Sequence, residues 1–256
     1  MNIIGIIPAR LASSRFPNKP LAKILGIPMV GHVYVRSKMC KELMDVYVAT
    51  CDNKIKAYIE SIGGKAVMTS DKHERASDRT AEALLKIEKA INKKIDIVVM
   101  IQGDEPMVTP EMISSAVVPL VDDDSIKVSN LMADIRTKED HEDPNEVKVV
   151  VDKKNFALYF SREPIPSRKK GVENVPMLKQ VCIIPFRRDF LLEYNSMEQT
   201  PLEIIESVDM NRILENGLKV KMIFTKCQTY SVDTLEDLKN VESAMQDDIL
   251  LKYYSK

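Results

Sequence analysis

The chain has 256 residues, of which 45% are hydrophobic and 29% are charged, so it can bury a sizeable core and lacks the composition of a disordered protein. Its 37 Lys and Arg residues balance its 38 Asp and Glu residues, which excludes the basic excess of a nonspecific nucleic-acid binder. No apolar run approaches the roughly 20 residues of a membrane span, and no basic segment precedes the apolar start as in a signal peptide. The four cysteines are scattered along the sequence, which suits reduced thiols. We therefore expect a cytoplasmic protein without membrane or nucleic-acid partners.

The first half of the sequence alternates short apolar runs with helical patterns. The runs predict strands at Asn2–Pro8, Met44–Thr50, Lys65–Thr69 and Asp96–Gln102. The patterns between them predict helices at Pro28–Met39, Asn53–Ile62 and Asp78–Ile91. Because runs that are apolar along their whole length suit strands covered on both faces, the alternation predicts parallel strands joined by right-handed helical crossovers.

The second half is more mixed. It predicts strands at Lys127–Ala133, Val147–Asp152, Phe156–Phe160, Leu178–Phe186 and Lys219–Phe224, and helices at Pro110–Val121, Pro201–Asn216 and Thr234–Gln246. Gly217 is expected to end the second of these helices, and Arg136–Asn145 and Arg168–Asn174 are expected to be exposed loops. The whole pattern predicts an α/β fold with a Rossmann-like, mostly parallel sheet flanked by helices and a smaller mixed-sheet lobe.

A basic loop follows the first predicted strand directly. Residues 8–21 read Pro-Ala-Arg-Leu-Ala-Ser-Ser-Arg-Phe-Pro-Asn-Lys-Pro-Leu and place three cations, Arg10, Arg15 and Lys19, within ten residues. The loop has neither the G-x-G-x-x-G fingerprint nor a P-loop motif, but arginine and lysine side chains can hold a triphosphate without either. The alternative is a solvated basic loop, which the buried strand before it and its stiffening prolines disfavour.

Two distant aspartates are predicted to lie at strand ends and could share one cation if the sheet brings these ends together. Asp104 lies just after the strand Asp96–Gln102, and Ser231–Thr234, which includes Asp233, is predicted to end another strand. Ligands of parallel sheets collect beyond the carboxyl ends of the strands, and Mg²⁺ prefers a few carboxylates together with phosphate oxygens and water. The alternative for Asp233 is that it or Thr234 caps the last helix.

The basic loop resembles the signature loop P-A-R-x-x-S-x-R-x-P-x-K-P-L of the CMP-Kdo synthetases, the 3-deoxy-manno-octulosonate cytidylyltransferases. The resemblance continues in order along nearly the whole chain, through Pro28-Met29, Val46–Asp52, Gly63–Thr69, Gln102–Pro106, Val147–Val150, Ala157–Pro166 and Ser231–Leu238. In that family the loop holds the phosphates of CTP, the aspartates bind Mg²⁺, and the protein pairs as a homodimer through its smaller lobe.

The resemblance implies roles for individual residues. It implies catalytic residues at Arg10, Arg15, Lys19 and Asp104, and Mg²⁺ ligands at Asp104 and Asp233. It implies a nucleotide site formed by Pro8, Ala9, Arg10, Ser13, Ser14, Arg15, Lys19, Asp78, Arg79 and Gln102. In the loop before Asp78, the family pattern H-x-S-G-T-D-R keeps His73, Asp78 and Arg79, whereas Arg75, Ala76 and Ser77 replace its Ser-Gly-Thr portion. A cap at Ser77 or Asp78 is expected to begin the following helix.

The acceptor side matches the family pattern Y-F-S-R-x-P-I-P at Tyr159–Pro166, which implies that Arg162 binds a carboxylate of the acceptor. The implied acceptor-binding residues are Gln102, Arg162, Gln180, Glu206 and Asp209. Four positions depart from the family: Gln180 replaces His, Ile184 replaces Tyr, Asp209 replaces Glu and Met210 replaces Gln. The changes favour an anionic acceptor whose hydroxyls differ from those of Kdo, with structural drift as the alternative.

These observations predict a Mg²⁺-dependent cytidylyltransferase that converts CTP and a 2-keto-3-deoxy sugar acid into a CMP-sugar and pyrophosphate for lipopolysaccharide or capsule biosynthesis. Within one domain, residues 1–256, the nucleotide part spans about 1–125, the acceptor and dimerisation lobe about 126–200, and the return to the main sheet about 201–256. No side chain stands out as the general base. Rival hypotheses are a different nucleotide or a phosphonate acceptor, an inactive nucleotide-binding module, and an oxidoreductase, which the missing glycine fingerprint opposes.

Overall fold

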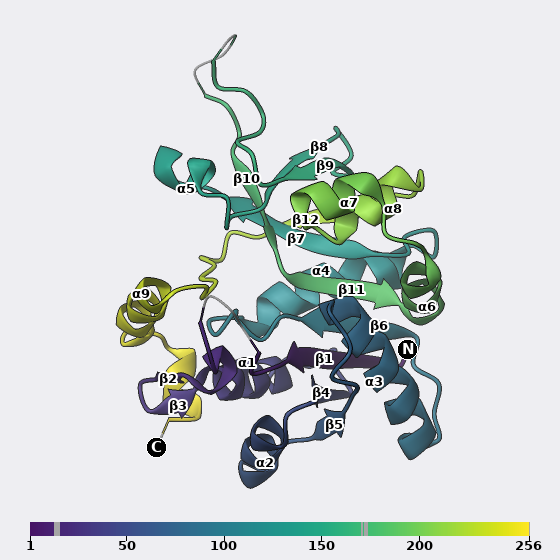
Figure 1. The fold of residues 1–256 in the computed structure, drawn as a ribbon, viewed down its shortest axis with the longest axis vertical. Coiled ribbons are helices and arrows are strands. Elements are labelled where there is room, and N and C mark those ends of the chain that lie inside the picture. The colour runs from purple at the N-terminus through teal and green to yellow at the C-terminus, as the bar shows by residue number, and fades with distance from the viewer. Residues whose placement is uncertain (13–15, 170, 172–173, 256) are drawn as a thin grey trace. The chain divides into compact units, whose positions relative to one another are not determined.

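A computed structural model describes residues 1–12, 16–169, 171 and 174–255, and it divides the chain into two compact units (Figure 1). Unit 1 comprises Met1–Ser114 and Thr229–Lys256, and unit 2 comprises Ser115–Gln228. Among the described residues, no helix is both long and apolar enough to cross a membrane.

Unit 1 is built on parallel strands in the order β6-β1-β4-β5. Its elements are β1 (Ile3–Ala9), η1 (Lys19–Leu21), β2 (Lys23–Ile24), β3 (Ile27–Pro28), α1 (Met29–Lys38), β4 (Asp45–Thr50), α2 (Asn53–Ser61), β5 (Ala66–Met68), α3 (Ala76–Ile91), β6 (Ile97–Ile101), α9 (Leu235–Met245) and η2 (Leu250–Tyr253). The helix α4 (Pro110–Asp122) crosses the boundary into unit 2. The predicted parallel sheet with helical crossovers is confirmed.

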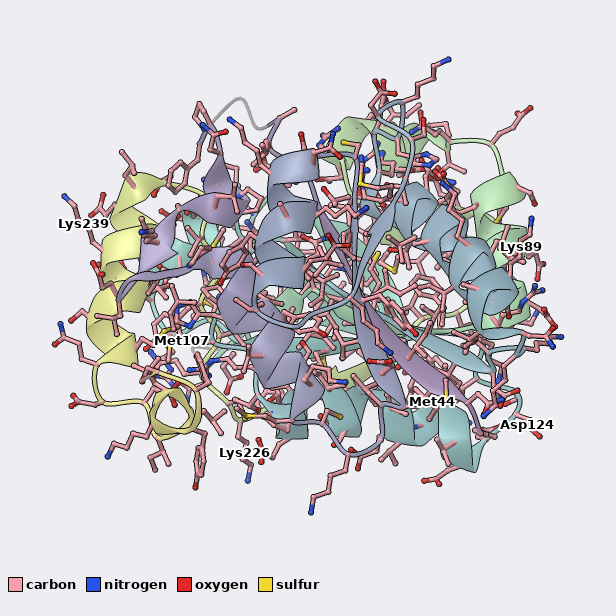
Figure 2. All side chains as sticks on the ribbon, turned by 90° about the horizontal axis from the view of Figure 1, so that it is seen from below. Met44, Lys89, Met107, Asp124, Lys226 and Lys239 are labelled. Carbon is pink, nitrogen blue, oxygen red and sulfur yellow. The ribbon has the colours of Figure 1, made fainter. Side chains whose placement is uncertain are left out.

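The strands of unit 1 form its core because their side chains are apolar on both faces. Every residue of β6 is buried, and β1 is buried from Ile3 to Ile7. Charged side chains such as Lys89 and Lys239 lie at the periphery of the unit (Figure 2). Such a two-sided core puts the polar loops at the ends of the strands.

The C-terminal segment packs onto the start of unit 1. Val232, Val241 and Met245 form one buried cluster with Ile24 and Met29, so α9 covers the hairpin of β2 and β3. The Tyr254 hydroxyl accepts a hydrogen bond from Arg36 Nε at 2.8 Å and lies 2.8 Å from His32 Nδ1. Arg36 also pairs with Asp248. The tail is therefore held by polar as well as apolar contacts.

Unit 2 carries a mixed sheet in the order β12-β7-β10-β8-β9. The pair of β7 and β12 is parallel, whereas the other neighbours are antiparallel. Its elements are β7 (Ser129–Asp134), α5 (Lys138–Glu142), β8 (Lys148–Val151), β9 (Ala157–Ser161), β10 (Leu178–Val181), β11 (Ile183–Arg187), α6 (Arg188–Ser196), α7 (Pro201–Glu206), α8 (Met210–Glu215) and β12 (Lys221–Phe224). The predicted smaller mixed-sheet lobe is confirmed.

The predicted strand Leu178–Phe186 is wrong as one element, because Cys182 interrupts it and separates β10 from β11. Val181 pairs with Leu131 and Phe186 bridges Val128. An advance of five residues along β10 and β11 therefore opposes an advance of only three residues along β7 and the residue before it. The Asn130 amide fills the irregularity by donating to the Val181 carbonyl at 2.6 Å. A period-2 pattern cannot reveal such a bulge, because the side chains on both sides of it are apolar.

The predicted helix Pro201–Asn216 is also wrong as one element, since α7 and α8 flank a turn at Ser207, which has a left-handed φ of 51°. The Glu206 and Ser207 carbonyls accept hydrogen bonds from the Arg162 side chain instead of continuing the helix. The glycine end is confirmed: Gly217, at φ 71°, donates to Leu214, and the next amide donates to Ile213, which is the Schellman pattern.

Two further local predictions fail, and one helix, α6, was not predicted. The predicted loop Arg136–Asn145 contains α5. Helix α3 begins at Ala76 with Arg75 in the N-cap position, so neither Ser77 nor Asp78 caps it. Arg75 has the extended backbone of an N-cap without a capping side chain, and residue preferences alone cannot locate such a start.

Candidate active site

The basic loop after β1 is pinned at both ends. The Leu11 amide donates to Asp52 Oδ2 at 2.8 Å, and the Asn18 amide donates to the Leu11 carbonyl at 3.3 Å. Asn18 adopts a left-handed φ of 60°, a conformation that asparagine tolerates better than most residues. The predicted residues Ser13, Ser14 and Arg15 lie outside the described part of the chain. The described ends of the loop therefore rest on a carboxylate at the end of β4.

Lys19 joins the two aspartates that the sequence singled out. Its Nζ lies 2.8 Å from Asp104 Oδ2 and 3.3 Å from Asp233 Oδ1, and it also donates to the Val232 carbonyl at 2.8 Å. Burial acts to lower the pKa of Lys19, but the two carboxylates outweigh it and raise the pKa above its ordinary value. The ammonium therefore stays charged, and both carboxylates lie within reach of a single cation.

Each aspartate reaches Lys19 for an identifiable backbone reason. Asp104 follows β6 after Gly103, where a Cβ would approach the Pro8 carbonyl to 3.3 Å, tighter than most real contacts. The Val232 amide then donates to the Asp104 carbonyl at 3.0 Å, which brings the segment before α9 beside the end of β6. A side chain larger than glycine at position 103 would push the Asp104 loop away from β1.

The capping alternative for Asp233 is settled by its neighbour. Thr234 is the N-cap of α9, and its side chain accepts from the Asp237 amide while the Asp237 carboxylate accepts from the Thr234 amide. This capping box satisfies the first turn of the helix. The Asp233 carboxylate is therefore directed to Lys19, although its backbone amide also donates to Asp237.

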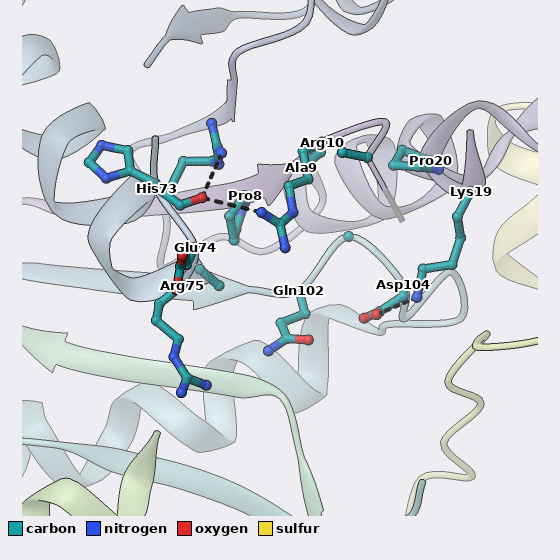
Figure 3. A pocket seen from close by; sticks show the side chains of 14 residues that line it. Pro8, Ala9, Arg10, Lys19, Pro20, His73, Glu74, Arg75, Gln102 and Asp104 are labelled. Atoms are coloured by element: carbon teal, nitrogen blue, oxygen red, sulfur yellow. Dashed lines mark hydrogen bonds and ion pairs between the residues drawn. The ribbon is translucent and has the colours of Figure 1, made fainter. Parts of the chain in front are cut away.

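A pocket of about 350 Å³ opens beside these residues, and several predicted nucleotide-binding residues line it (Figure 3). Its lining includes Pro8, Ala9, Arg10, Lys19, Arg79, Gln102 and Asp104, together with His73, Glu74 and Arg75. Of the described residues predicted to bind the nucleotide, Asp78 is absent from this lining. The volume lies in the range of small-molecule sites.

The far wall of the pocket is the loop 70–75, which two arginines hold by its backbone. The His73 carbonyl accepts from Arg10 Nη1 at 3.3 Å and from Arg79 Nη2 at 3.5 Å. Arg79 is buried and also donates to Thr69 Oγ1 at 2.7 Å. Arg79 is thus a support of the pocket wall, whereas the Arg10 guanidinium faces the pocket (Figure 3).

Glu82 fixes the same loop from behind. Its carboxylate contacts the His73 ring, accepts from the Ser70 amide at 2.9 Å and pairs with Lys86. Burial works against ionisation, but these donors lower the pKa of Glu82 to about 2. His73 is therefore tied to a carboxylate by its ring and to Arg10 by its carbonyl.

The donor set of Asp104 and Asp233 is small. Among the described residues, no group of three or more His, Cys, Asp and Glu side chains could hold a metal ion. Two carboxylates that already share one ammonium nevertheless fit Mg²⁺, because this ion is usually bound by one or two carboxylates while phosphates and water complete its shell.

In unit 2, Arg162 lies at the C-terminus of α7 and is held by backbone carbonyls. Its guanidinium donates to the carbonyls of Glu206 at 2.7 Å, Pro144 at 2.7 Å and Ser207 at 3.3 Å. A helix C-terminus favours a cation. An arginine has five N–H groups, so within the described structure these three bonds leave two for an anion.

The Glu206 carboxylate is occupied inside unit 2. It accepts from the Tyr159 hydroxyl at 2.8 Å, the Ser161 hydroxyl at 2.8 Å and the Arg162 amide at 2.7 Å. Although burial opposes it, these hydrogen bonds lower the pKa of Glu206, while burial and Glu206 raise the pKa of Tyr159 to about 12. Glu206 thus braces the end of β9, from which Arg162 projects.

The remaining residues predicted on the acceptor side either bond to neighbouring residues, take a helix-cap position or are buried. Gln180 donates to Asn130 Oδ1 at 2.6 Å, and Asp209 occupies the N-cap position of α8 without a capping bond from its side chain. Ile184 and Met210 are buried in the core. Burial of these two favours the packing explanation for their departure from the family pattern over a direct contact with an acceptor.

Two supporting residues were not predicted. Asp52 follows β4 directly, and its place beyond a strand end is a signal that could have identified it. Glu82 lies nine residues from His73 and inside α3, a spacing with no sequence signature.

The comparisons with known proteins agree with this geometry. A family model described as Cytidylyltransferase matches residues 4–247. The 3-deoxy-manno-octulosonate cytidylyltransferase of Geobacter metallireducens is 41% identical over 94% of this chain and 96% of its own, and that of Geotalea uraniireducens is 41% identical over 94% and 98%. A solved structure of CMP:2-keto-3-deoxy-manno-octonic acid synthetase complexed with CTP matches with a TM-score of 0.88 and 36% identity, covering 96% of this chain and 99% of that one. The chain therefore belongs to the cytidylyltransferase family, among its CMP-Kdo synthetases, and is a nucleotidyltransferase enzyme.

Proposed function

We propose that this enzyme transfers the CMP group of CTP to a 2-keto-3-deoxy sugar acid with Mg²⁺ and releases pyrophosphate. The observation that carries the proposal is the group of Lys19, Asp104 and Asp233 beside a pocket at the end of β1 and β6. The relatives are named for the same transfer, and one related structure holds CTP. We also expect a cytoplasmic location, where CTP is available.

The pocket suits a nucleoside triphosphate by its charge. Arg10 and Lys19 are cations on its wall, and arginine offers planar paired donors to phosphate oxygens. The prediction for Ser13, Ser14 and Arg15 would add a third cation and two hydroxyls to the same loop. The amide and carbonyl contacts of Leu11 fix the loop, so the cations are positioned before the nucleotide arrives.

Asp104 and Asp233 would hold the Mg²⁺. When bound, the ion supplies charge neutralisation for the phosphates. Because both carboxylates now contact the Lys19 ammonium, Lys19 would release at least one of them and become available to the phosphate oxygens.

In the transfer, the anomeric hydroxyl of the acceptor forms a new bond to the α-phosphorus of CTP. The bond from that phosphorus to the bridging oxygen of the β-phosphate breaks, pyrophosphate leaves, and the hydroxyl proton passes to solvent. Arg10 and Lys19 stabilise the charge that builds up on the departing oxygens. Positioning and electrostatics therefore carry the catalysis in this proposal.

The acceptor's carboxylate would bind Arg162. Three of its five N–H groups donate to backbone carbonyls, and the remaining two can form a paired contact with a carboxylate. Because three carbonyls already hold the guanidinium, little side-chain entropy is lost on binding. An anionic 2-keto acid is thus preferred over its neutral derivatives.

The test is pyrophosphate release with CTP, Mg²⁺ and a panel of 2-keto sugar acids that includes Kdo and its 8-amino and 5-deoxy analogues. We expect release that requires both CTP and a carboxylate-bearing acceptor, with ATP, GTP and UTP as controls. Release with none of the acids, or with a phosphonate acceptor alone, would overturn the proposal. Equal use of Kdo and its analogues, with no gain from Gln180→His and Met210→Gln, would assign the four departures to drift.

A further inference from the structure

Lys148 is a fully buried lysine at the start of an otherwise apolar strand. It begins β8, is followed by three valines, and has no exposed surface. In the described part of the chain its ammonium is bound by backbone carbonyls rather than by a carboxylate: Nζ donates to the Asp143 carbonyl at 2.8 Å and to the Arg162 carbonyl. Burying a charge in this way costs free energy, and a valine would fit the pattern of the strand better.

The two carbonyls belong to the segments that direct Arg162. Asp143 ends α5, and the next residue, Pro144, is the one whose carbonyl accepts from Arg162 Nη1 at 2.7 Å. Arg162 itself follows β9. The Lys148 ammonium therefore ties the backbone of Arg162 to the segment that holds the tip of its side chain.

We propose that Lys148 is a positioning residue for Arg162 and, through it, sets how tightly the enzyme binds the carboxylate of its acceptor. The inference rests on the proposed function. Without the ammonium, the Asp143 and Arg162 carbonyls lose their common donor, Pro144 is free to shift, and the guanidinium no longer holds its two remaining N–H groups in one direction. Arg162 would still be present, but it would be less well oriented.

The charges around Lys148 are mixed. Burial lowers its pKa and Arg162 adds to this effect, while the acidic residues Asp143, Glu146 and Glu163 act in the opposite direction. Arg162 also has a carboxylate beside it, since its amide donates to Glu206 Oε2 at 2.7 Å. The contribution of Lys148 to Arg162 therefore comes from the two carbonyls that its ammonium holds.

The experiment compares Lys148→Met with Lys221→Met in full steady-state kinetics with CTP and Kdo. Met keeps the length of the side chain but removes the ammonium. Lys221 is the control, because it also lies in a strand of this sheet and also donates to a backbone carbonyl, that of Lys154 at 2.6 Å. It bridges Phe156, which precedes β9, whereas Arg162 follows the other end of β9. We expect the KM for Kdo to rise about tenfold or more in Lys148→Met, with kcat and the KM for CTP within about twofold, and no change in Lys221→Met.

A double-mutant cycle with Arg162→Gln separates positioning from general damage. If Lys148 acts through Arg162, the double variant has about the same KM for Kdo as Arg162→Gln alone, because residues that share one interaction are not additive. Lys148→Met should also lose most of the preference for Kdo over its neutral carboxamide. Lys148→Gln, which keeps donors without the charge, gives an intermediate result and serves in place of Met if that variant does not fold.

The outcomes are distinguishable. If the wild-type enzyme releases no pyrophosphate with CTP and Kdo, the proposed function fails. If the wild-type enzyme is active but Lys148→Met leaves the KM for Kdo unchanged, raises the KM for CTP equally, or multiplies its effect with that of Arg162→Gln, Lys148 is a structural residue only and the inference is wrong.

Discussion

At the scale of single residues, the proposed metal ligands of the nucleotide pocket are two carboxylates that both contact one ammonium. Lys19 contacts Asp104 and Asp233 at once, and each contact is only partly shielded from water. Removing either carboxylate leaves Lys19 with the other carboxylate and the Val232 carbonyl, but removes half of the donor set proposed for Mg²⁺. The chemistry should therefore suffer far more than the fold.

We predict that Asp104→Asn and Asp233→Asn each lower kcat by orders of magnitude, roughly 10²-fold or more, at saturating Mg²⁺, while the protein stays folded. The amide keeps the shape of the side chain but not its charge. Pyrophosphate release measures the rate, and circular dichroism checks the fold. Asp247→Asn, the same change at an exposed position, is the control and should leave kcat and the fold unchanged. Near-normal turnover in both variants would remove the metal assignment.

At the scale of elements, the loop after β1 depends on the end of β4. The two strands pair in register from Ile4 with Asp45 to Ala9 with Thr50, so the residues just beyond them meet. This is how Asp52 comes to accept from the Leu11 amide. The carboxylate replaces the partner that a buried backbone amide requires.

We predict that Asp52→Ala raises the KM for CTP by about tenfold, with a smaller effect on the KM of the acceptor. The loop then loses the hydrogen bond that fixes its first turn, and Arg10 is less well positioned. Asp52→Asn retains an acceptor oxygen and should recover most of the loss. Isothermal titration of CTP checks the prediction, and an unchanged affinity in Asp52→Ala would show that the loop is held by other contacts.

At the scale of the whole molecule, the C-terminal tail is held through His32, a buried histidine. Burial lowers its pKa, the neighbouring Arg36 also lowers it, and the bond to the Ile24 carbonyl only partly opposes this. The ring faces the Tyr254 hydroxyl and the Ile24 carbonyl, and Asp248 lies on the other side of Arg36. The folded state therefore favours the neutral ring, whereas the unfolded chain takes up a proton below about pH 6.5.

We predict that the free energy of unfolding falls as the pH is lowered from about 7.5 to 5.5, by at most about 1.4 kcal/mol from His32. The unfolded state binds more protons in this range, so acid favours unfolding. Urea denaturation at the two pH values measures the loss. His32→Gln cannot titrate and should lose less stability over the same interval, although it is less stable at both values. An equal loss in both proteins would assign the effect to other groups.

We also predict a homodimer, as the family resemblance implies, formed through the smaller lobe. A closed symmetric dimer is the commonest oligomer of soluble enzymes. Sedimentation velocity at micromolar concentration tests this directly. A species with the 29.0 kDa mass of one chain would contradict the prediction.

Much of the fold follows from local sequence features. The parallel strands were predictable because β1 and β6 are apolar along their whole length and β4 is apolar between Asp45 and Thr50 at its ends. A strand with no polar face must be covered on both sides. The predicted limits Asn2–Pro8 and Asp96–Gln102 differ from those of β1 and β6 by one residue at each end. The basic loop and Asp104 were found because polar residues directly beyond such strands have few structural explanations. Asp233 was assigned through the family resemblance. The strand predicted to end at Ser231–Thr234 is wrong, because no strand is assigned in the described segment between β12, which ends at Phe224, and α9.

The sequence by itself therefore determined the type of sheet, the place of the nucleotide pocket and, through its motifs, the family. Only the tertiary structure decided which partner each polar group takes. Arg162 meets the carbonyls of Pro144 and Ser207, 18 and 45 residues away, and Asp52 meets an amide 41 residues away. Such partners are set by strand register and by turns such as the one at Ser207, which depend on packing across the fold and have no local pattern. For the same reason, nothing in the sequence distinguishes Lys148 from other lysines. Only the folded chain buries it and brings its ammonium to the carbonyls of Asp143 and Arg162.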